Sequence, residues 1–127
     1  MGKLLLAGIG GFIGSALRYA VAGLVQNRSD SIRFPFGTLA VNLLGCAAIG
    51  FLSQLAESRG VFTAEARVLI FIGVLGGFTT FSAFGNETMN LWRDGENTVA
   101  CVNVAANVVL CLGAIWFSRA IAFQLWR

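Results

Sequence analysis

The sequence predicts an all-α membrane protein with four transmembrane helices. The chain of 127 residues is 57% hydrophobic but only 12% charged, whereas about a quarter of the residues in a typical soluble domain are charged. Its charged side chains gather in short connections between four apolar runs, each about long enough to cross a bilayer. We therefore expect a single four-helix domain, residues 1–127, with spans at about 4–26, 35–56, 67–92 and 98–121.

The first apolar run carries small residues at helical spacing together with one charge. Gly10, Gly14 and Ala22 share a helix face, and small residues at that spacing let helices approach closely. Arg18 lies on the same face, at a depth where a charge costs about 2.5–3.5 kcal/mol on insertion scales. Its side chain either snorkels to the interface or makes a wet vestibule electropositive and attracts anions.

The second apolar run begins at the only proline, Pro35, which suits the first turn of a helix. No charge interrupts this run, and its polar exception is Asn42. An amide inside the membrane either joins neighbouring helices or offers a hydrogen-bond donor to a passing anion.

The third apolar run is a poor helix in its middle. Glycines, threonines and a serine occupy Gly73–Phe84, where a simple span would carry Leu, Ile and Val. This pattern predicts a broken transmembrane helix, which is tolerated only inside protein or beside a wet cavity, and whose freed carbonyls can bind a cation. The alternative is a glycine packing face, because Gly73 and Gly77 form a GxxxG step.

Two phenylalanines follow the weak stretch. Phe81 and Phe84 are i, i+3 neighbours, and they are either packing aromatics or a pair whose electropositive ring edges attract a small anion. The hydroxyls of Thr80 and Ser82 would then replace the water that the anion loses. Glu87 comes later in the same run and is most simply an interfacial carboxylate.

The last apolar run carries a line of polar residues. Asn103, Asn107 and Cys111 recur at i, i+4 and i+8, which places them along one face of a helix. Polar groups inside a membrane are costly and tend to face the interior of the bundle. The three cysteines of the chain, Cys46, Cys101 and Cys111, lie in apolar runs and are interpreted as small buried side chains.

Several kinds of function do not fit this sequence. The chain has no histidine, its carboxylates are scattered, and its glycine-rich segments lack the ending of a phosphate loop, so we expect no enzyme. The small basic excess forms no stripe, so we expect no nucleic-acid partner. No ring of acidic residues lies in the deep segments, which disfavours a cation pore. Anion transport remains.

Four spans place both termini on one side of the membrane. The basic residues expected on the terminal side are Lys3, Arg59, Arg67, Arg119 and Arg127. Those expected on the opposite side are Arg28, Arg33 and Arg93. This five-to-three bias specifies orientation weakly, so the chain can insert both ways and pair with an inverted copy of itself.

Two motifs resemble those of the CrcB or Fluc family of small fluoride channels. The segment Gly37–Gly45, with Asn42, is similar to the second-helix signature of the family. The segment Gly76–Phe84 is similar to its broken third helix, and Arg18 and Glu87 also match in place and order. The resemblance implies an antiparallel, dual-topology homodimer in the lipid of a prokaryotic plasma membrane, where it exports fluoride passively and confers fluoride resistance.

The resemblance also assigns roles to individual residues. It implies a structural sodium ion, not transported, held by the backbone carbonyls of Gly76 and Thr79 of both subunits. The residues implied to line the fluoride pore are Asn42, Thr80, Ser82, Phe81 and Phe84. The resemblance places Arg18 at the entrance and Glu87 near the pore.

The chain departs from the family pattern at two places. Ala83 removes a hydroxyl that many members carry between the two phenylalanines. Asn103, Asn107 and Cys111 replace Tyr and Ser residues of some members, and we expect the two amides to keep a polar track along the pore.

Two other functions stay open at this stage. A small dual-topology multidrug or cation exporter would need a deep carboxylate in its first helix, where this chain carries Arg18. A non-transporting membrane subunit would explain the glycine packing, but it would not explain the asparagine line or the paired phenylalanines.

Overall fold

The four apolar runs form helices joined by short connections. The computed structural model describes residues 1–126. The elements in chain order are α1 (Gly2–Arg28), α2 (Phe36–Arg59), α3 (Ala64–Arg67), the π-helix η1 (Val68–Leu75), α4 (Gly76–Phe78), α5 (Phe81–Arg93) and α6 (Asn97–Leu125). Within the described residues, 4 segments are long and apolar enough to cross a membrane. The prediction of an all-α multi-pass membrane protein with four such helices is therefore confirmed.

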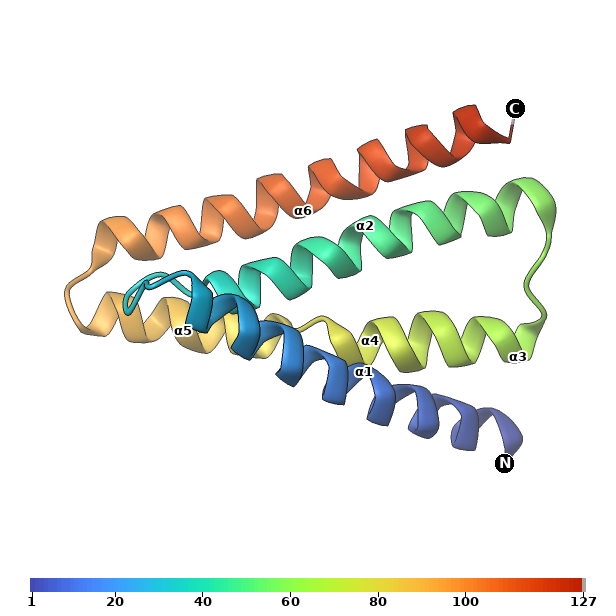
Figure 1. Cartoon of the computed structure of the whole chain (residues 1–127), viewed down its shortest axis with the longest axis horizontal. Coiled ribbons are helices and arrows are strands. Elements are labelled where there is room, and N and C mark those ends of the chain that lie inside the picture. The colour runs from blue at the N-terminus through green and yellow to red at the C-terminus, as the bar shows by residue number, and fades with distance from the viewer. Residues whose placement is uncertain (127) are drawn as a thin grey trace.

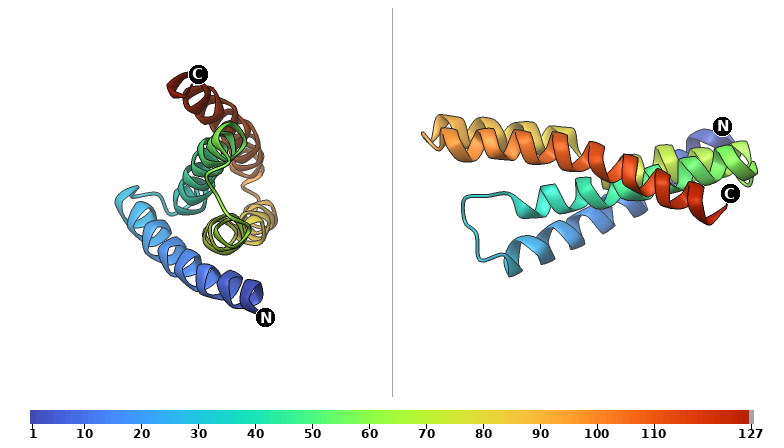
Figure 2. Two further views of the ribbon diagram at one scale, coloured as in Figure 1. Left: turned by 90° about the vertical axis from the view of Figure 1, so that its right-hand side faces the viewer. Right: turned by 90° about the horizontal axis from the view of Figure 1, so that it is seen from above.

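Both termini lie at one end of the molecule. Figure 1 shows this end on the right, together with the connection between α2 and α3, while the other two connections lie on the left. Helix α2 packs lengthwise beside α6, and α1 crosses η1 and α4 at an angle (Figure 2).

Hydrogen bonds of Gln26 hold the connection between α1 and α2. The Gln26 side-chain nitrogen donates to the Ser31 carbonyl at 2.7 Å and to the Phe34 carbonyl at 3.2 Å. The Gln26 side-chain oxygen accepts from the Gly37 N–H at 3.0 Å. One side chain thus satisfies backbone groups at the end of the connection and at the start of α2, where no preceding turn supplies partners.

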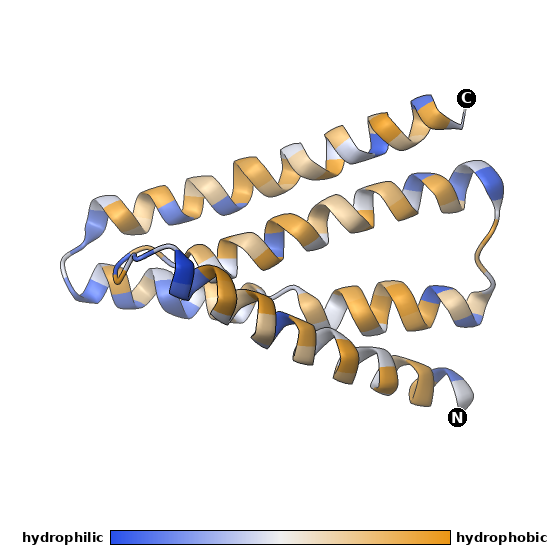
Figure 3. Ribbon diagram, viewed as in Figure 1, coloured by the Kyte–Doolittle hydropathy of each residue, from blue (hydrophilic) through white to orange (hydrophobic). Residues whose placement is uncertain are grey.

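The buried core of this chain is small, and its most deeply buried apolar side chains are small. Val41, Ala56, Ala100 and Ala122 are at most 3% exposed. Most large apolar side chains are exposed, and Figure 3 shows hydrophobic colour along much of the long helices. A water-soluble surface rarely shows large continuous apolar patches, so this surface suits contact with lipid or with another membrane helix.

Glycines on α1 pack directly against glycines of the third run. A Cβ added to Gly10 would lie 2.8 Å from the Gly73 Cα and 2.5 Å from the Leu69 carbonyl oxygen. A Cβ added to Gly77 would lie 2.7 Å from the Gly11 carbonyl oxygen. The glycine packing face anticipated as an alternative therefore exists, and α1 is the helix that it contacts.

The regular helix of the third run stops between Phe78 and Phe81. Thr79 (φ −82°, ψ 159°) and Thr80 (φ −151°, ψ 121°) are extended. The Thr80 hydroxyl then accepts from the Ala83 N–H at 3.1 Å and caps the start of α5. Glycine packing and an interrupted helix thus both occur in the third run, because the packing glycines lie in the turns just before the extended threonines.

Candidate functional site

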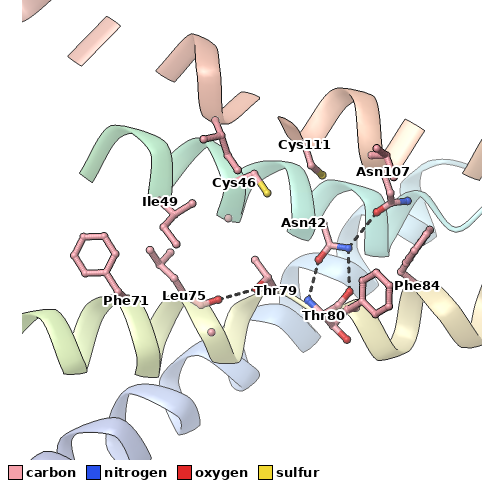
Figure 4. A pocket seen from close by; sticks show the side chains of 15 residues that line it. Asn42, Cys46, Ile49, Phe71, Leu75, Thr79, Thr80, Phe84, Asn107 and Cys111 are labelled. Carbon is pink, nitrogen blue, oxygen red and sulfur yellow. Dashed lines mark hydrogen bonds between the residues drawn. The ribbon is translucent and has the colours of Figure 1, made fainter. Parts of the chain in front are cut away.

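The side chain of Asn42 binds the extended backbone of Thr80. Its Oδ1 accepts from the Thr80 N–H at 2.8 Å, and its Nδ2 donates to the Thr80 carbonyl at 3.0 Å (Figure 4). An extended residue inside a membrane would otherwise leave both groups unpaired, since lipid offers no hydrogen-bond partners. The sequence left two roles open for this amide, joining neighbouring helices or donating to an anion. In the structure it joins helices, and its partners include the Thr80 backbone as well as a side chain.

A chain of hydrogen bonds continues from Asn42 across α6 to α5. Asn42 Nδ2 also donates to Asn107 Oδ1 at 3.1 Å. Asn107 Nδ2 donates to the backbone oxygen and to Oδ1 of Asn103, both at 3.0 Å. Asn103 Nδ2 donates to the Thr88 hydroxyl at 2.9 Å, which donates to the Phe84 carbonyl at 2.8 Å. The network ties α2, α5 and α6 together around the interruption.

The two N–H bonds of an amide limit what these asparagines can bind. Both donors of Asn42 and both donors of Asn107 are directed at protein oxygens. Asn103 is 0% exposed. A ligand would therefore receive a hydrogen bond from Asn42 or Asn107 only by displacing a bond within the network.

A cavity of about 400 Å³ lies beside the interrupted segment. We call it the break cavity, and its lining residues include Asn42, Thr79, Thr80, Phe81, Phe84 and Asn107, with Cys46 and Cys111 farther along (Figure 4). The rings of Phe81 and Phe84 meet with centroids 5.3 Å apart and planes tilted by 62°. Phe84 is 8% exposed whereas Phe81 is 81% exposed, so only one of the two rings is covered by this chain.

The Ser82 hydroxyl is exposed and shares one hydrogen bond with the Thr80 hydroxyl, in which either oxygen can be the donor. Because the Thr80 hydroxyl oxygen accepts from Ala83, its own proton is available for the Ser82 oxygen, 3.2 Å away. The Ser82 proton can then point outward, next to the exposed ring of Phe81. An exposed hydroxyl donor and an exposed ring edge thus lie at adjacent positions.

A second cavity of about 960 Å³, the vestibule cavity, contains the two charged residues singled out in the sequence. Arg18, Glu87, Thr38 and Thr80 are among its lining residues, and Thr80 lines the break cavity as well. Arg18 Nη1 donates to the Thr79 carbonyl at 3.4 Å, so its guanidinium is directed to the interruption. Glu87 Oε1 accepts from the Thr38 hydroxyl at 2.6 Å.

The backbone carbonyls of Gly76 and Thr79, which the sequence analysis assigned to a sodium ion, have lone pairs that protein donors do not use. In an unbroken helix the Gly76 carbonyl would accept from the N–H of Thr80, which here donates to Asn42 instead. The Thr79 carbonyl accepts the long bond from Arg18, and a carbonyl oxygen has two lone pairs. Backbone carbonyls are ligands that suit hard cations.

Some contacts of this site were missed in the sequence. Thr38 and Thr88, which bind Glu87 and Asn103, are ordinary hydroxyls in apolar runs, so only the packing of the helices reveals their partners. The expectation that the cysteines are buried is wrong for Cys101, which is exposed. Its side of α6 is not covered by this chain.

The comparisons with known proteins cover almost the whole chain. The family model described as CrcB-like protein, Camphor Resistance (CrcB), matches residues 5–119. A relative from Chlorobaculum tepidum, named fluoride-specific ion channel FluC, is 46% identical over 127 residues, 100% of this chain and 98% of the relative. One of the same name from Methylobacillus flagellatus is 44% identical and covers 91% of each chain. FluC 1 of Methanosarcina acetivorans is 40% identical, over 98% of this chain and 94% of its own. This chain belongs to the CrcB family.

Proposed function

We propose that this chain is a subunit of a fluoride-selective channel that exports fluoride passively across a prokaryotic plasma membrane. The observation that carries the proposal is the convergence of a ring pair, an exposed hydroxyl and a vestibule with an arginine at one interrupted helix. The names of the relatives support fluoride as the ion. A channel performs no covalent chemistry, so this function needs no nucleophile and no base.

Fluoride would be stabilised by groups that bind a small anion without carrying a full charge. The edges of Phe81 and Phe84 carry partial positive charge, and the Ser82 hydroxyl donates a hydrogen bond. Because these contacts are weak, the ion is held strongly enough to enter and weakly enough to leave, which conduction requires. The tight amide network behind them keeps the rings in place, since it fixes the start of α5.

The vestibule cavity would gather the anion. Arg18 lies half-buried at this cavity, and a positive charge in a low-dielectric cleft raises the local concentration of anions. Glu87 shares the cavity, and its contact with the Thr38 hydroxyl holds the carboxylate to one side.

We also propose that two copies assemble as an antiparallel, dual-topology homodimer. Phe81 belongs to the proposed pore and yet is 81% exposed in one chain, so a second chain is needed to enclose the path. The weak charge bias of the connections favours insertion in both orientations. The extended Thr79–Thr80 segment then becomes a break within a membrane span, tolerated because it is covered by protein.

A structural sodium ion fits the residues at the centre of this assembly. The Gly76 carbonyl has lost its helical donor, and the Thr79 carbonyl retains a lone pair, so both oxygens can serve as ligands. Unwound carbonyls of broken membrane helices coordinate sodium in other transport proteins. The ion would supply positive charge that offsets the aligned carbonyl dipoles, and it would not be transported.

The decisive experiment is fluoride efflux from liposomes. Purified protein is reconstituted with potassium fluoride inside, valinomycin starts the efflux, and a fluoride electrode follows it beside a matched potassium chloride experiment. We expect fast fluoride release, little chloride release, and no dependence on a proton gradient. A well-folded dimer that releases no fluoride would rule the channel out and leave the non-transporting subunit. Transport that requires a proton gradient would favour the exporter instead.

A further inference from the structure

Two cysteines on different helices line the break cavity. Cys46 on α2 and Cys111 on α6 both line this cavity (Figure 4). Cys46 follows Asn42 by one helical turn, and Cys111 follows Asn107 by one turn, so the thiol pair is the next layer beyond the amide pair. Both thiols are free and half-buried.

We propose that Cys46 and Cys111 form a two-thiol binding site for a soft metal ion of the class of Cu(I), Ag(I) and Hg(II). Thiolates select soft metals, and such ions accept two sulfur ligands. The rest of the cavity wall near the pair is apolar and includes Ile49, Leu75 and Ile115. Hg(II) bound by two thiolates is neutral there, whereas Cu(I) or Ag(I) would leave one negative charge, so the apolar wall favours the divalent ion within this class.

The binding step with mercuric chloride conserves charge and oxidation state. Two S–Hg bonds form as two Hg–Cl bonds and two S–H bonds break, and two protons leave with two chloride ions. The proton count separates a shared site from two independent thiols, each of which would keep one chloride and release one proton. Metal binding to cysteine releases protons in general, because the thiolate is the ligand.

The site lies beside the proposed ion path. Phe81, Phe84 and Asn107 line the same cavity as the two cysteines. A metal ion held between the thiols would narrow this cavity and fix α2 to α6. The third cysteine, Cys101, is exposed elsewhere on α6 and supplies a matched control.

The binding test uses the full-length Cys101→Ala protein in detergent, titrated with mercuric chloride in weak buffer. We expect one mercury ion retained per chain after desalting, with two protons released. Two ions per chain with one proton each would overturn the shared site, and so would no retained metal. This measurement requires neither fluoride flux nor a substitution at Cys46 or Cys111.

Single removal of either partner provides the second test. In the Cys101→Ala background, Cys46→Ala or Cys111→Ala is expected to weaken mercury binding by about 100-fold or more, because the second thiol acts at high effective concentration. Size-exclusion elution checks that each variant is folded. Unchanged affinity in either folded variant would contradict a shared site.

The position beside the ion path is tested in liposomes. Mercuric chloride should block fluoride efflux through Cys101→Ala protein, dithiothreitol should restore it, and Cys46→Ala should remove the block. Efflux that continues with metal bound would contradict the placement. If the protein shows no fluoride efflux before metal is added, the channel proposal is contradicted. The mercury titration in detergent then tests the metal site by itself.

Discussion

At the scale of single residues, Asn42 is the side chain on which the site depends most. It makes three hydrogen bonds, two to the Thr80 backbone and one to Asn107. The Thr80 N–H and carbonyl have no neighbouring helical turn to bind, so the amide replaces the missing partners. Asn42 thus stabilises the extended backbone between α4 and α5. It contributes to an anion path by positioning Thr80 and the residues that follow.

We expect Asn42→Leu to destabilise the protein and to abolish fluoride efflux. Leucine is similar in size but leaves the buried Thr80 N–H and carbonyl unpaired, at about 1–3 kcal/mol for each group. Thermal unfolding in detergent and liposome efflux measure the two effects. Asn97→Ala, an exposed amide at the start of α6, is the control and should change neither. An Asn42→Leu protein with normal stability and efflux would show that the amide is dispensable.

Phe81→Ile tests the aromatic ring edge. The substitution keeps an apolar side chain of moderate size but removes the electropositive edge together with the ring pair that Phe81 forms with Phe84, and such pairs are worth about 0.5–1.5 kcal/mol. Fluoride efflux should therefore fall up to roughly tenfold, since about 1.4 kcal/mol corresponds to a factor of ten. Phe117→Ile on α6, also exposed, should leave efflux unchanged. Equal efflux from both variants would mean that Phe81 only packs.

At the scale of elements, the third run combines a close-packed half with an interrupted one. Glycines of η1 and α4 meet α1 without side chains between them, and the extended threonines follow within one turn. Close backbone contact anchors the first half, so the interruption is held between a fixed helix and the amide of Asn42. A π-helix precedes it, and such segments often occur at functional sites.

Gly10→Ala is expected to destabilise the α1 interface. The new methyl group would lie against backbone atoms of Leu69 and Gly73 that cannot move aside easily. Overpacking of this kind typically costs about 1–3 kcal/mol. Gly8→Ala is the matched control, because nothing lies within 4 Å of its added carbon, and it should be neutral or slightly stabilising. Equal melting temperatures would mean that α1 shifts freely at this contact.

Sodium should stabilise the assembled protein if the Gly76 and Thr79 carbonyls bind it. A ligand that binds only the folded state adds about 2.7 kcal/mol at a concentration 100 times its dissociation constant. The melting temperature in detergent should therefore rise with sodium chloride but not with N-methylglucamine chloride at the same ionic strength. A melting temperature that is independent of sodium would remove the ion from the proposal while leaving the fluoride path intact.

At the scale of the whole molecule, one chain by itself does not enclose the proposed ion path. Its buried residues are few and mostly small, most of its large apolar side chains are exposed, and one ring of the proposed path is exposed. Lipid can cover apolar helices, but it cannot enclose a polar path. A second chain in the opposite orientation supplies the missing wall, and the weak charge bias of the connections permits that orientation.

Shifting the charge balance should therefore disable the channel. The double variant Val61→Lys/Arg33→Gln adds a positive charge at the terminal end and removes one from the other end, and both positions are exposed. The substitution of Arg33 removes only its ion pair with Glu96, whose N···O distance is 3.2 Å, and the arginine side chain is 73% exposed. We expect one orientation to predominate and efflux to fall.

Co-expression gives the control for this variant. A partner with the opposite bias, Lys3→Gln/Ile32→Lys/Arg59→Gln, has more basic residues at the other end than at the terminal end, and Lys3 is exposed. It should be weak alone and should restore efflux when both are made together. Ile32 is fully exposed in the connection between α1 and α2. Normal efflux from each biased variant alone would contradict an antiparallel dimer.

The sequence by itself determined the helical membrane class, the four apolar segments and the weak stretch of the third run. Each of these follows from composition and local propensity, which are properties of neighbouring residues. It also singled out Asn42, Phe81, Phe84 and Arg18, because a polar or paired aromatic group in an apolar run is conspicuous.

Only the tertiary structure decided what these residues contact. It showed that Asn42 binds the Thr80 backbone and that Asn103 and Asn107 donate hydrogen bonds to protein oxygens. It also showed that two cysteines line one cavity. Such partners are many residues apart in the chain, and their meeting depends on how α2, α5 and α6 are rotated against one another. Helical rotation is set by packing of whole faces, so no local pattern specifies it.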